Sequence, residues 1–333
     1  MDPVTQAAVG AAAAQGKSPL TTVKQAAVVG ALAGMAPDLD ILIRSSHDPL
    51  LALEFHRHFT HSLFFIPIGA AICALFFYYV LNRWWKLKFG VIYLWSLLGY
   101  ASHGLLDGCT TYGTQLLWPL NDTRVAWNAI AVVDPLFTLP LILGVILTIK
   151  MKIRRWWFAG LIWCLSYLAL GMIQNERAVS SAALLAESRG HSNVQIVAKP
   201  SFANIIVWKT VYEHEGYFYV DAVRPGLAEP KHWQGDRIEE LSIARHLPWL
   251  AADSQQAQDI ERFRHFSSGY IGVDPDNAYK IIDIRYSLLP HQIDPLWGIV
   301  LDPIATPQQH VGYYTQRDNA NEALKTLATM MFE

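Results

Sequence analysis

The chain carries little charge and few cysteines. Only 16% of its 333 residues are charged, against about 25% in an average soluble protein, and the net charge of −2 provides no basic surface for a polyanion. We therefore expect no nucleic-acid partner. The three cysteines (Cys73, Cys109 and Cys164) show no Cys-x-x-Cys spacing, which excludes a disulfide scaffold and a cysteine-rich metal site. The first residues lack the pattern of a removable signal peptide, so we expect none.

Apolar and aromatic side chains are abundant instead. Hydrophobic residues make up 52% of the chain, and 12 Trp, 14 Tyr and 14 Phe are present, as in membrane proteins with interfacial aromatic belts. Residues 1–173 contain 12 Lys and Arg and eight Asp and Glu, whereas residues 174–333 contain 14 and 20. The sequence thus predicts two domains, a membrane-embedded helical domain over 1–173 and a soluble domain over 174–333.

The first domain contains several segments that are long and apolar enough to cross a bilayer. The hydrocarbon core of about 30 Å requires about 20 helical residues, and four segments fit: Ser62–Leu81, Phe89–Leu106, Ala129–Ile149 and Trp156–Ile173. Two weaker helices near Val4–Gln15 and Leu20–Ala36 predict a partly inserted hairpin before them. We expect a mainly α protein, a polytopic helical membrane bundle followed by a soluble α+β domain.

Charge is distributed unevenly between the two ends of these helices. All eight acidic residues of the first domain lie at one end, and nine of its 12 basic residues lie at the other: Lys17, Lys24, Arg83, Lys86, Lys88, Lys150, Lys152, Arg154 and Arg155. The positive-inside rule places the basic end in the cytoplasm. We expect a multi-pass protein of the bacterial inner membrane whose C-terminal domain is extracytoplasmic, in the periplasm of a Gram-negative cell.

The second domain shows hairpin and helix patterns. Apolar and polar residues alternate over Asn204–Tyr212 and Tyr217–Arg224, and again over Phe266–Val273 and Tyr279–Tyr286, with turn residues between the members of each pair. Helices are expected near Arg237–His246, Ser254–Phe263 and Asp318–Met331, and one near Arg177–Glu187 could continue the last span. The seven histidines of this domain (His191, His214, His232, His246, His265, His291 and His310) show no ligand spacing, so we interpret them as structural.

Histidine and aspartate of the first domain gather in short motifs at the acidic ends of the helices. Pro37-Asp38-Leu39-Asp40 follows the second helix, and His56-Arg57-His58-Phe59-Thr60-His61-Ser62 precedes the next span. His103 and Asp107 lie four residues apart and share one helix face, and Asp134 stands inside an apolar run. Ionisable groups at membrane depth are costly unless they are paired or bound to metal. Because imidazole and carboxylate suit Zn²⁺, with Mn²⁺ or Fe²⁺ possible, we predict a divalent-metal site with these ligands: Asp38, His56, His61, His103 and Asp107.

Each motif also has a purely structural interpretation. His103 and Asp107 could form an ordinary pair one helical turn apart, and the two aspartates of the first motif could end a helix in water. The three histidines could belong to an interfacial loop, and Asp134 could cap the helix that follows it. The metal interpretation therefore rests on the expected convergence of all these groups on one membrane face.

These motifs, with Asp2-Pro3-Val4-Thr5 and Thr110-Thr111-Tyr112-Gly113, resemble those of the YdjM-type inner-membrane hydrolases. The resemblance covers about residues 1–150 and implies a metal-dependent, phospholipase-like membrane hydrolase. In some bacteria LexA controls genes of this family, which concerns regulation and implies no DNA binding. The family is distantly similar to zinc-dependent phospholipase C and P1-type nucleases, whose helical sites use His-x3-Asp ligand pairs.

Two positions depart from the family pattern. Members usually begin Asp-Pro-x-Thr-His, and Gln6 stands where that histidine would be. Glutamine is a poor ligand for Zn²⁺, so either one metal position is weakened or that histidine is not essential. His58 stands where a small residue is common, and it is a candidate for a substitute ligand.

The resulting hypothesis is metal-assisted hydrolysis of a phosphoester of a lipid or lipid-linked substrate. Asp40 or Asp134 would act as general base or orient a histidine, and Arg57 would hold a phosphate oxygen. Thr60, Thr111 and Tyr112 would form hydrogen bonds to substrate or ligands. Two alternatives remain open: a non-catalytic membrane anchor for an envelope-binding soluble domain, and an ion transporter. The second domain shows no catalytic constellation, and its role and protein partner are left open.

Overall fold

The computed structural model describes residues 1–226 and 229–333, which pack as two compact units. The first unit comprises Met1–Leu42, Phe55–Ile173 and Phe202–Asn204. The second comprises Ile43–Glu54, Gln174–Ser201 and Ile205–Glu333. The chain passes from one unit to the other after Ile173, where its composition changes. Membership of Ile43–Glu54 in the second unit was not expected, because the segment lies between two motifs of the first domain.

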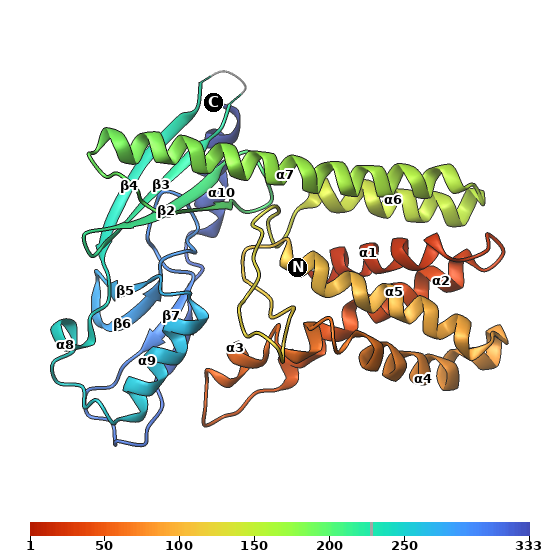
Figure 1. Cartoon of the computed structure of the whole chain (residues 1–333), viewed down its shortest axis with the longest axis horizontal. Helices are drawn as coiled ribbons and strands as arrows, with labels where there is room; N and C mark the ends of the chain where they lie inside the picture. Colours follow the sequence, from red (N-terminus) through yellow and green to blue (C-terminus); the bar gives the residue numbers. More distant parts are fainter. Residues whose placement is uncertain (227–228) are drawn as a thin grey trace. The chain divides into compact units, whose positions relative to one another are not determined.

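The first unit is helical (Figure 1). Its elements are α1 (Pro3–Gly16), α2 (Val23–Met35), η1 (Ala36–Leu42), η2 (Phe59–His61), α4 (Ile66–Trp85), α5 (Phe89–Gly108), α6 (Pro135–Met151) and the first part of α7 (Arg154–Ser188). Helix α5 contacts α1, α2 and α4, and α1 also contacts α6. A short helix, α3 (Leu51–Phe55), precedes η2. Helix α5 therefore lies at the centre of the packed helices.

Within the described residues, four helical stretches are long and apolar enough to cross a membrane: Val23–Leu42, Ile66–Trp85, Phe89–Gly108 and Arg154–Ser188. The first of them was expected to belong to a partly inserted hairpin, but η1 lengthens α2. The last continues well past Ile173 and includes the helix expected near Arg177–Glu187.

The span expected to begin at Ala129 was wrong at its start. Helix α6 begins at Pro135 and is a shorter apolar helix of 17 residues. Asp134 caps it, and the amide of Ala129 donates to the carbonyl oxygen of Cys109 at 2.8 Å. Residues before Asp134 are therefore bonded to the end of α5 instead of forming a helix.

Glycine permits the close packing of α1, α2 and α5. A Cβ atom at Gly30 would overlap the carbonyl oxygen of Gly10 on α1, and one at Gly99 on α5 would overlap the carbonyl oxygen of Gly30. The three backbones approach each other at this level because no side chain separates them. The contact lies about one helical turn from Gly34, whose carbonyl oxygen faces the candidate site.

The second unit contains two antiparallel four-stranded sheets. One has the order β1 (Ile196–Pro200), β2 (Trp208–His214), β3 (Tyr217–Arg224), β4 (Lys231–Glu239); the other has β5 (Ile271–Asp274), β6 (Asn277–Asp283), β7 (Trp297–Val300), β8 (Gly312–Thr315). Val220 of β3 and Ile282 of β6 belong to one buried cluster, so the sheets share a core. Helices α8 (Ile243–His246), α9 (Gln255–Phe266) and α10 (Ala320–Phe332) complete the unit.

Both expected hairpins are present; β3 has the predicted bounds, and the other three strands differ from the prediction at their ends. Strand β2 begins at Trp208, and β5 begins at Ile271 because α9 continues through Phe266. The helix expected near Arg237–His246 was wrong over its first residues, which belong to β4. There Ile238 pairs with Phe218 of β3, and both side chains enter the core of the unit. About half of the described chain is helical, and the remainder includes these two sheets.

Candidate metal centre

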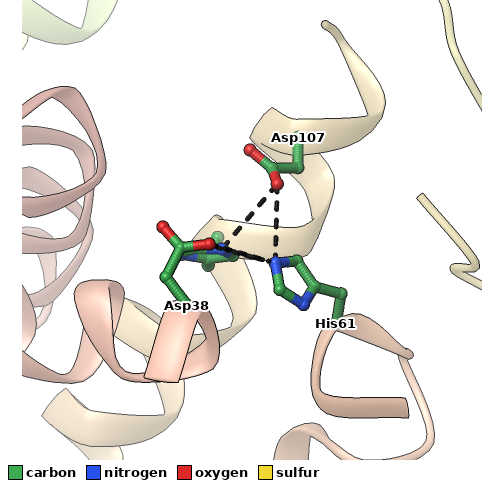
Figure 2. Close-up of side chains that lie close together, drawn as sticks. Asp38, His61 and Asp107 are labelled. Carbon is green, nitrogen blue, oxygen red and sulfur yellow. Dashed lines mark hydrogen bonds and ion pairs between the residues drawn. The ribbon is translucent and has the colours of Figure 1, made fainter. Parts of the chain in front are cut away.

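Four side chains of the first unit converge on one point. Asp38 comes from η1, His61 from η2 and Asp107 from α5 (Figure 2). His103 lies one turn before Asp107 on α5. His61 Nε2 is 3.5 Å from both Asp38 Oδ1 and Asp107 Oδ2. His103 Nε2 is 3.4 Å from Asp38 Oδ1 and 3.9 Å from Asp107 Oδ2. Each residue thus offers one nitrogen or oxygen atom to a common centre.

These separations are those of a tetrahedral coordination shell. Zinc–ligand bonds of about 2.0–2.2 Å give tetrahedral edges of about 3.3–3.6 Å, because the edge is about 1.63 times the bond length. The four distances of 3.4–3.9 Å between imidazole nitrogens and carboxylate oxygens agree with these edges to within a few tenths of an ångström. The edge between the two Nε2 atoms is shorter, at 2.8 Å. The residues therefore fit a divalent ion in donor type, and they fit it in spacing once the two rings move slightly apart.

The two imidazole rings are oriented for metal binding. His103 Nδ1 lies 2.5 Å from the carbonyl oxygen of Gly34, and His61 Nδ1 lies 3.0 Å from Thr60 Oγ1 and 3.2 Å from Asp40 Oδ2. A proton on each Nδ1 leaves the Nε2 lone pairs facing the centre, as in metal-bound histidines.

The carboxylates make this centre attractive to cations. Burial acts to lower the pKa of His61, but Asp107, Asp38 and Asp40 outweigh burial and raise it to about 10. The carboxylate set therefore favours a positive charge between the rings. A divalent ion would satisfy the same demand.

Asp40 contacts two histidines at the centre, His56 and His61. Its Oδ1 is 2.8 Å from His56 Nδ1, while its Oδ2 accepts from Thr60 Oγ1 at 2.7 Å and from the amide of Arg57 at 3.1 Å. Asp38, Asp40 and His56 form a second group of metal-type ligands. Because Asp40 is buried and already contacts two histidines, its main effect is to orient them.

Asp107 is held by three neighbours. Gln6 Nε2 donates to Asp107 Oδ1 at 2.8 Å, the Met1 amino group contacts the same oxygen, and Arg57 Nε lies 3.0 Å from Oδ2. Oδ2 is buried and accepts no hydrogen bond within the described chain. Its remaining lone pair is therefore available to an ion. Gln6, the residue that departs from the family pattern, thus contacts a predicted ligand.

Arg57 adopts an unusual backbone conformation beside the centre. Its φ of +64° lies in the left-handed region, which is uncommon for residues with a side chain. The buried guanidinium donates to Thr110 Oγ1 at 2.9 Å and lies 5.0 Å from the ring centroid of Tyr112. Such strain is concentrated at functional sites in proteins, and here it accompanies a cation next to the ligand set.

The loop that carries His61 reaches α5 because Gly104 has no side chain. A Cβ atom there would lie 2.5 Å from the carbonyl oxygen of His61. Tyr100, one turn earlier on α5, donates its hydroxyl hydrogen to the carbonyl oxygen of Thr60 at 2.9 Å. These two contacts bring His61 next to His103, and the sequence offered no signal for them beyond their position on the same helix.

Asp134 and His58 lie outside both ligand groups. Asp134 accepts from the amide of Phe137 at 3.1 Å and from the Tyr167 hydroxyl at 2.8 Å, so it caps α6. His58, considered as a substitute ligand, packs its ring 5.1 Å from that of Trp118. Thr60 contacts Asp40, as described. Thr111 follows Thr110 in the chain and is buried.

The part of the chain that contains the centre is also the part that matches a known family. The family model described as YdjM inner membrane protein matches residues 1–178, which include every residue of the centre. The chain belongs to the YdjM inner membrane protein family. It is thus a membrane protein, and its apolar helices are those of an inner-membrane family.

Two curated relatives of this YdjM-family chain are similar over shorter stretches. Inner membrane protein YbcI of Escherichia coli (strain K12) is 34% identical over 109 residues, which are 31% of this chain and 60% of that protein. Uncharacterized protein YfhP of Bacillus subtilis (strain 168) is 33% identical over 115 residues, or 33% of each chain. The chain thus spans less than two thirds of either relative. No solved structure matches it.

Proposed function

We propose that this protein is a metal-dependent hydrolase that cleaves a phosphoester of a lipid or lipid-linked substrate at the membrane surface. The observation that carries the proposal is the convergence of one ligand atom each from Asp38, His61, His103 and Asp107 on a common centre. Zn²⁺ suits two imidazoles and two carboxylates best, with Mn²⁺ or Fe²⁺ as alternatives. Because four protein ligands fill a tetrahedral shell, a bound divalent ion would need a fifth position for water. There it would supply a hydroxide at neutral pH by lowering the pKa of water from 15.7 to about 7.

The side chains around the ligands would orient the histidines and bind the phosphate. Asp40 fixes the rings of His56 and His61, and Arg57 places a guanidinium next to the ligand set, where it would neutralise a phosphate oxygen. Asp38 is the most exposed of the four ligands, with 24% of its side-chain surface accessible, against 0% for the others. Substrate would enter beside Asp38, and the carboxylate oxygen of Asp38 that does not face the two rings would accept a proton from the attacking water.

The surroundings of Asp38 favour a lipid substrate. Leu39, Ile41 and Leu42 of η1 are 63%, 56% and 64% exposed, whereas Asp40 between them is 3% exposed. One short helix therefore directs acidic side chains toward the ligand set and apolar side chains outward. Exposed apolar groups beside a polar site are typical of contact with membranes. A substrate with acyl chains would contact these side chains while its phosphoester reaches the ligands.

The charge distribution favours the extracytoplasmic face. The ligands lie at the ends of α2 and α5 opposite the basic residues Lys86 and Lys88. By the positive-inside rule those lysines face the cytoplasm. We therefore propose that the ligand set and the second unit are extracytoplasmic.

The proposal is tested on the full chain purified in detergent and returned to phospholipid vesicles. We expect about one zinc per chain by mass spectrometry and release of a phosphorylated headgroup or a free phosphate from the lipid. His61→Ala should abolish both. His265→Ala, which alters an exposed histidine of the second unit, should change neither.

The two alternatives predict other outcomes. Bound zinc without hydrolysis of any phospholipid or lipid-linked phosphate, together with zinc flux into vesicles, would replace the hydrolase by a transporter. If the chain binds no zinc and the His61→Ala variant retains the cellular function, the protein is a membrane anchor and not a hydrolase.

A further inference from the structure

The segment Ile43–Glu54 connects two parts of the metal centre along the chain. It begins just after Asp40 and ends just before His56, two residues whose side chains contact each other at 2.8 Å. The segment itself nevertheless packs as part of the second unit. Both of its ends are thus joined to residues of the centre, while its ion pairs are with Arg262 of α9 and with His310.

Arg262 of α9 binds this segment at two points. Its Nε and Nη2 atoms donate to Glu54 Oε1 and Oε2 at 2.6 and 2.8 Å, and its Nη1 and Nη2 atoms donate to Asp48 Oδ1 and Oδ2 at 3.1 and 2.8 Å. A further bond of 2.8 Å joins Nη1 to Asp259 Oδ1. These bonds use all five N–H donors of a guanidinium, and both carboxylates of the segment are held bidentately.

The charges around Arg262 make it difficult to replace. Three carboxylates surround one guanidinium, and Asp259 is fully buried. His310 also contacts Asp259, with 2.8 Å between Nδ1 and Oδ2. Burial acts to raise the pKa of Asp48, but hydrogen bonds from Arg262 and its charge outweigh burial and hold the pKa below its ordinary value. Removing Arg262 would leave three acidic groups close together without their common partner.

Asp48 and Glu54 connect Arg262 to different parts of the segment. Asp48 also accepts from the amide of Leu50 at 3.0 Å, and the Leu50 side chain is buried. Glu54 lies in α3, the short helix that leads into the His56 motif. Arg262 therefore anchors the middle of the segment through Asp48 and the end nearest His56 through Glu54.

We propose that Arg262 is a positioning residue for the metal centre. By holding Asp48 and Glu54 it keeps the segment in one conformation and so sets the placement of His56 against Asp40. The positioning role rests on the proposed metal function, but the ordering of the segment does not. A free segment would sample many conformations, and ion binding would have to order it. A segment ordered in advance leaves more of the binding free energy for affinity. This assigns a role to the second unit.

The test compares three variants of the full chain in detergent. Arg262→Ala removes the link from α9, and the double variant Asp48→Ala/Glu54→Ala removes it from the segment while leaving the Arg262–Asp259 pair intact. Arg264→Ala is the matched control, because Arg264 lies on the same helix and pairs with Glu261. Two quantities are measured: amide hydrogen exchange over residues 43–54 without metal, and the dissociation constant for zinc by competition with a chelator.

We expect faster exchange over residues 43–54 and zinc binding weakened about 10- to 100-fold, as for other residues that orient metal ligands, in both link variants. The control should match the unaltered chain in both quantities. If Arg262→Ala does not fold, the double variant decides alone. An unchanged zinc dissociation constant in a folded double variant would overturn the positioning role and leave the hydrolase proposal intact. Absence of zinc binding by the unaltered chain would overturn both.

Discussion

The Nε2 atoms of His61 and His103 lie 2.8 Å apart, although the Nδ1 atom of each ring already faces an oxygen. Two neutral rings in these tautomers would direct lone pairs at each other. A proton or a metal ion between them removes the repulsion, and the two flanking carboxylates favour either. The predictions below separate residues that would bind an ion from residues that hold the fold.

His103→Ala is expected to remove bound zinc. The variant loses one of the two nitrogen donors and leaves one imidazole with two carboxylates, a donor set that zinc sites seldom use. Zinc content of the purified protein, measured by mass spectrometry, should fall from about one per chain to a small fraction. Gly34 also loses the partner of its carbonyl oxygen, so thermal stability is measured in parallel. Full zinc occupancy in this variant would disprove the assignment of His103.

Asp40→Asn is expected to weaken zinc binding about 10- to 100-fold without abolishing it. An amide has one oxygen acceptor, whereas the Asp40 carboxylate contacts His56 through one oxygen and His61 through the other. Saturating zinc should therefore restore full occupancy. Asp122→Asn, at an exposed acidic residue of the same unit, is the control. Complete and irreversible loss of zinc in Asp40→Asn would make Asp40 a direct ligand instead.

Asp134→Ala is expected to destabilise the protein and leave zinc binding unchanged. Loss of a helix N-cap costs about 0.5–2 kcal/mol, and the buried Tyr167 hydroxyl also loses its acceptor. The thermal unfolding midpoint of the variant in detergent should fall. Asp134→Asn, which retains a capping oxygen, should fall less. A loss of zinc or activity at unchanged stability would return Asp134 to the centre.

Gly30→Val is expected to disrupt the packing of the first unit. Its side chain would occupy the place of the Gly10 carbonyl oxygen and would approach Ala14 Cβ to 2.5 Å. The helices would have to separate, which also displaces Gly34 from His103. Folded yield in detergent and zinc content should both decrease. Gly90→Val is the control, because no atom lies within 4 Å of a Cβ placed there. A well-folded Gly30→Val protein would contradict the close contact.

The second unit should become more stable as the pH rises above neutral. Burial lowers the pKa of Lys209 to about 7, whereas an unfolded lysine has a pKa of about 10.4. Between these values the unfolded chain binds more protons, so the free energy of unfolding increases with pH. Lys209→Met should reduce the increase and raise the unfolding midpoint at pH 7.

The midpoint is measured at pH 7 and pH 9 for the unaltered chain, for Lys209→Met and for Lys231→Met. Lys231 is exposed on β4, so its variant should keep the increase of the unaltered chain. An equal increase in Lys209→Met would show that Lys209 keeps its proton in the folded state across this range.

Local patterns predicted those features that depend on neighbouring residues. The apolar run at Phe89–Leu106 and the i, i+4 pair of His103 and Asp107 could be read directly, because one helix determines both. The start of α6 was misplaced because residues before Asp134 bond to the end of α5. Strand β4 was misread as helix where Ile238 enters the core, since burial against Phe218 outweighed local preference.

The sequence by itself determined the membrane character of the chain, the approximate places of most helices and the residue types available for a metal. Helix periodicity, apolar length and charge act along the chain and need no partner. Only the tertiary structure decided which of those residues meet. Gly104 admits the backbone of His61, Gly34 orients His103, and Arg262 holds a segment more than 200 residues away in sequence. These contacts depend on the distances between separate elements, which packing sets.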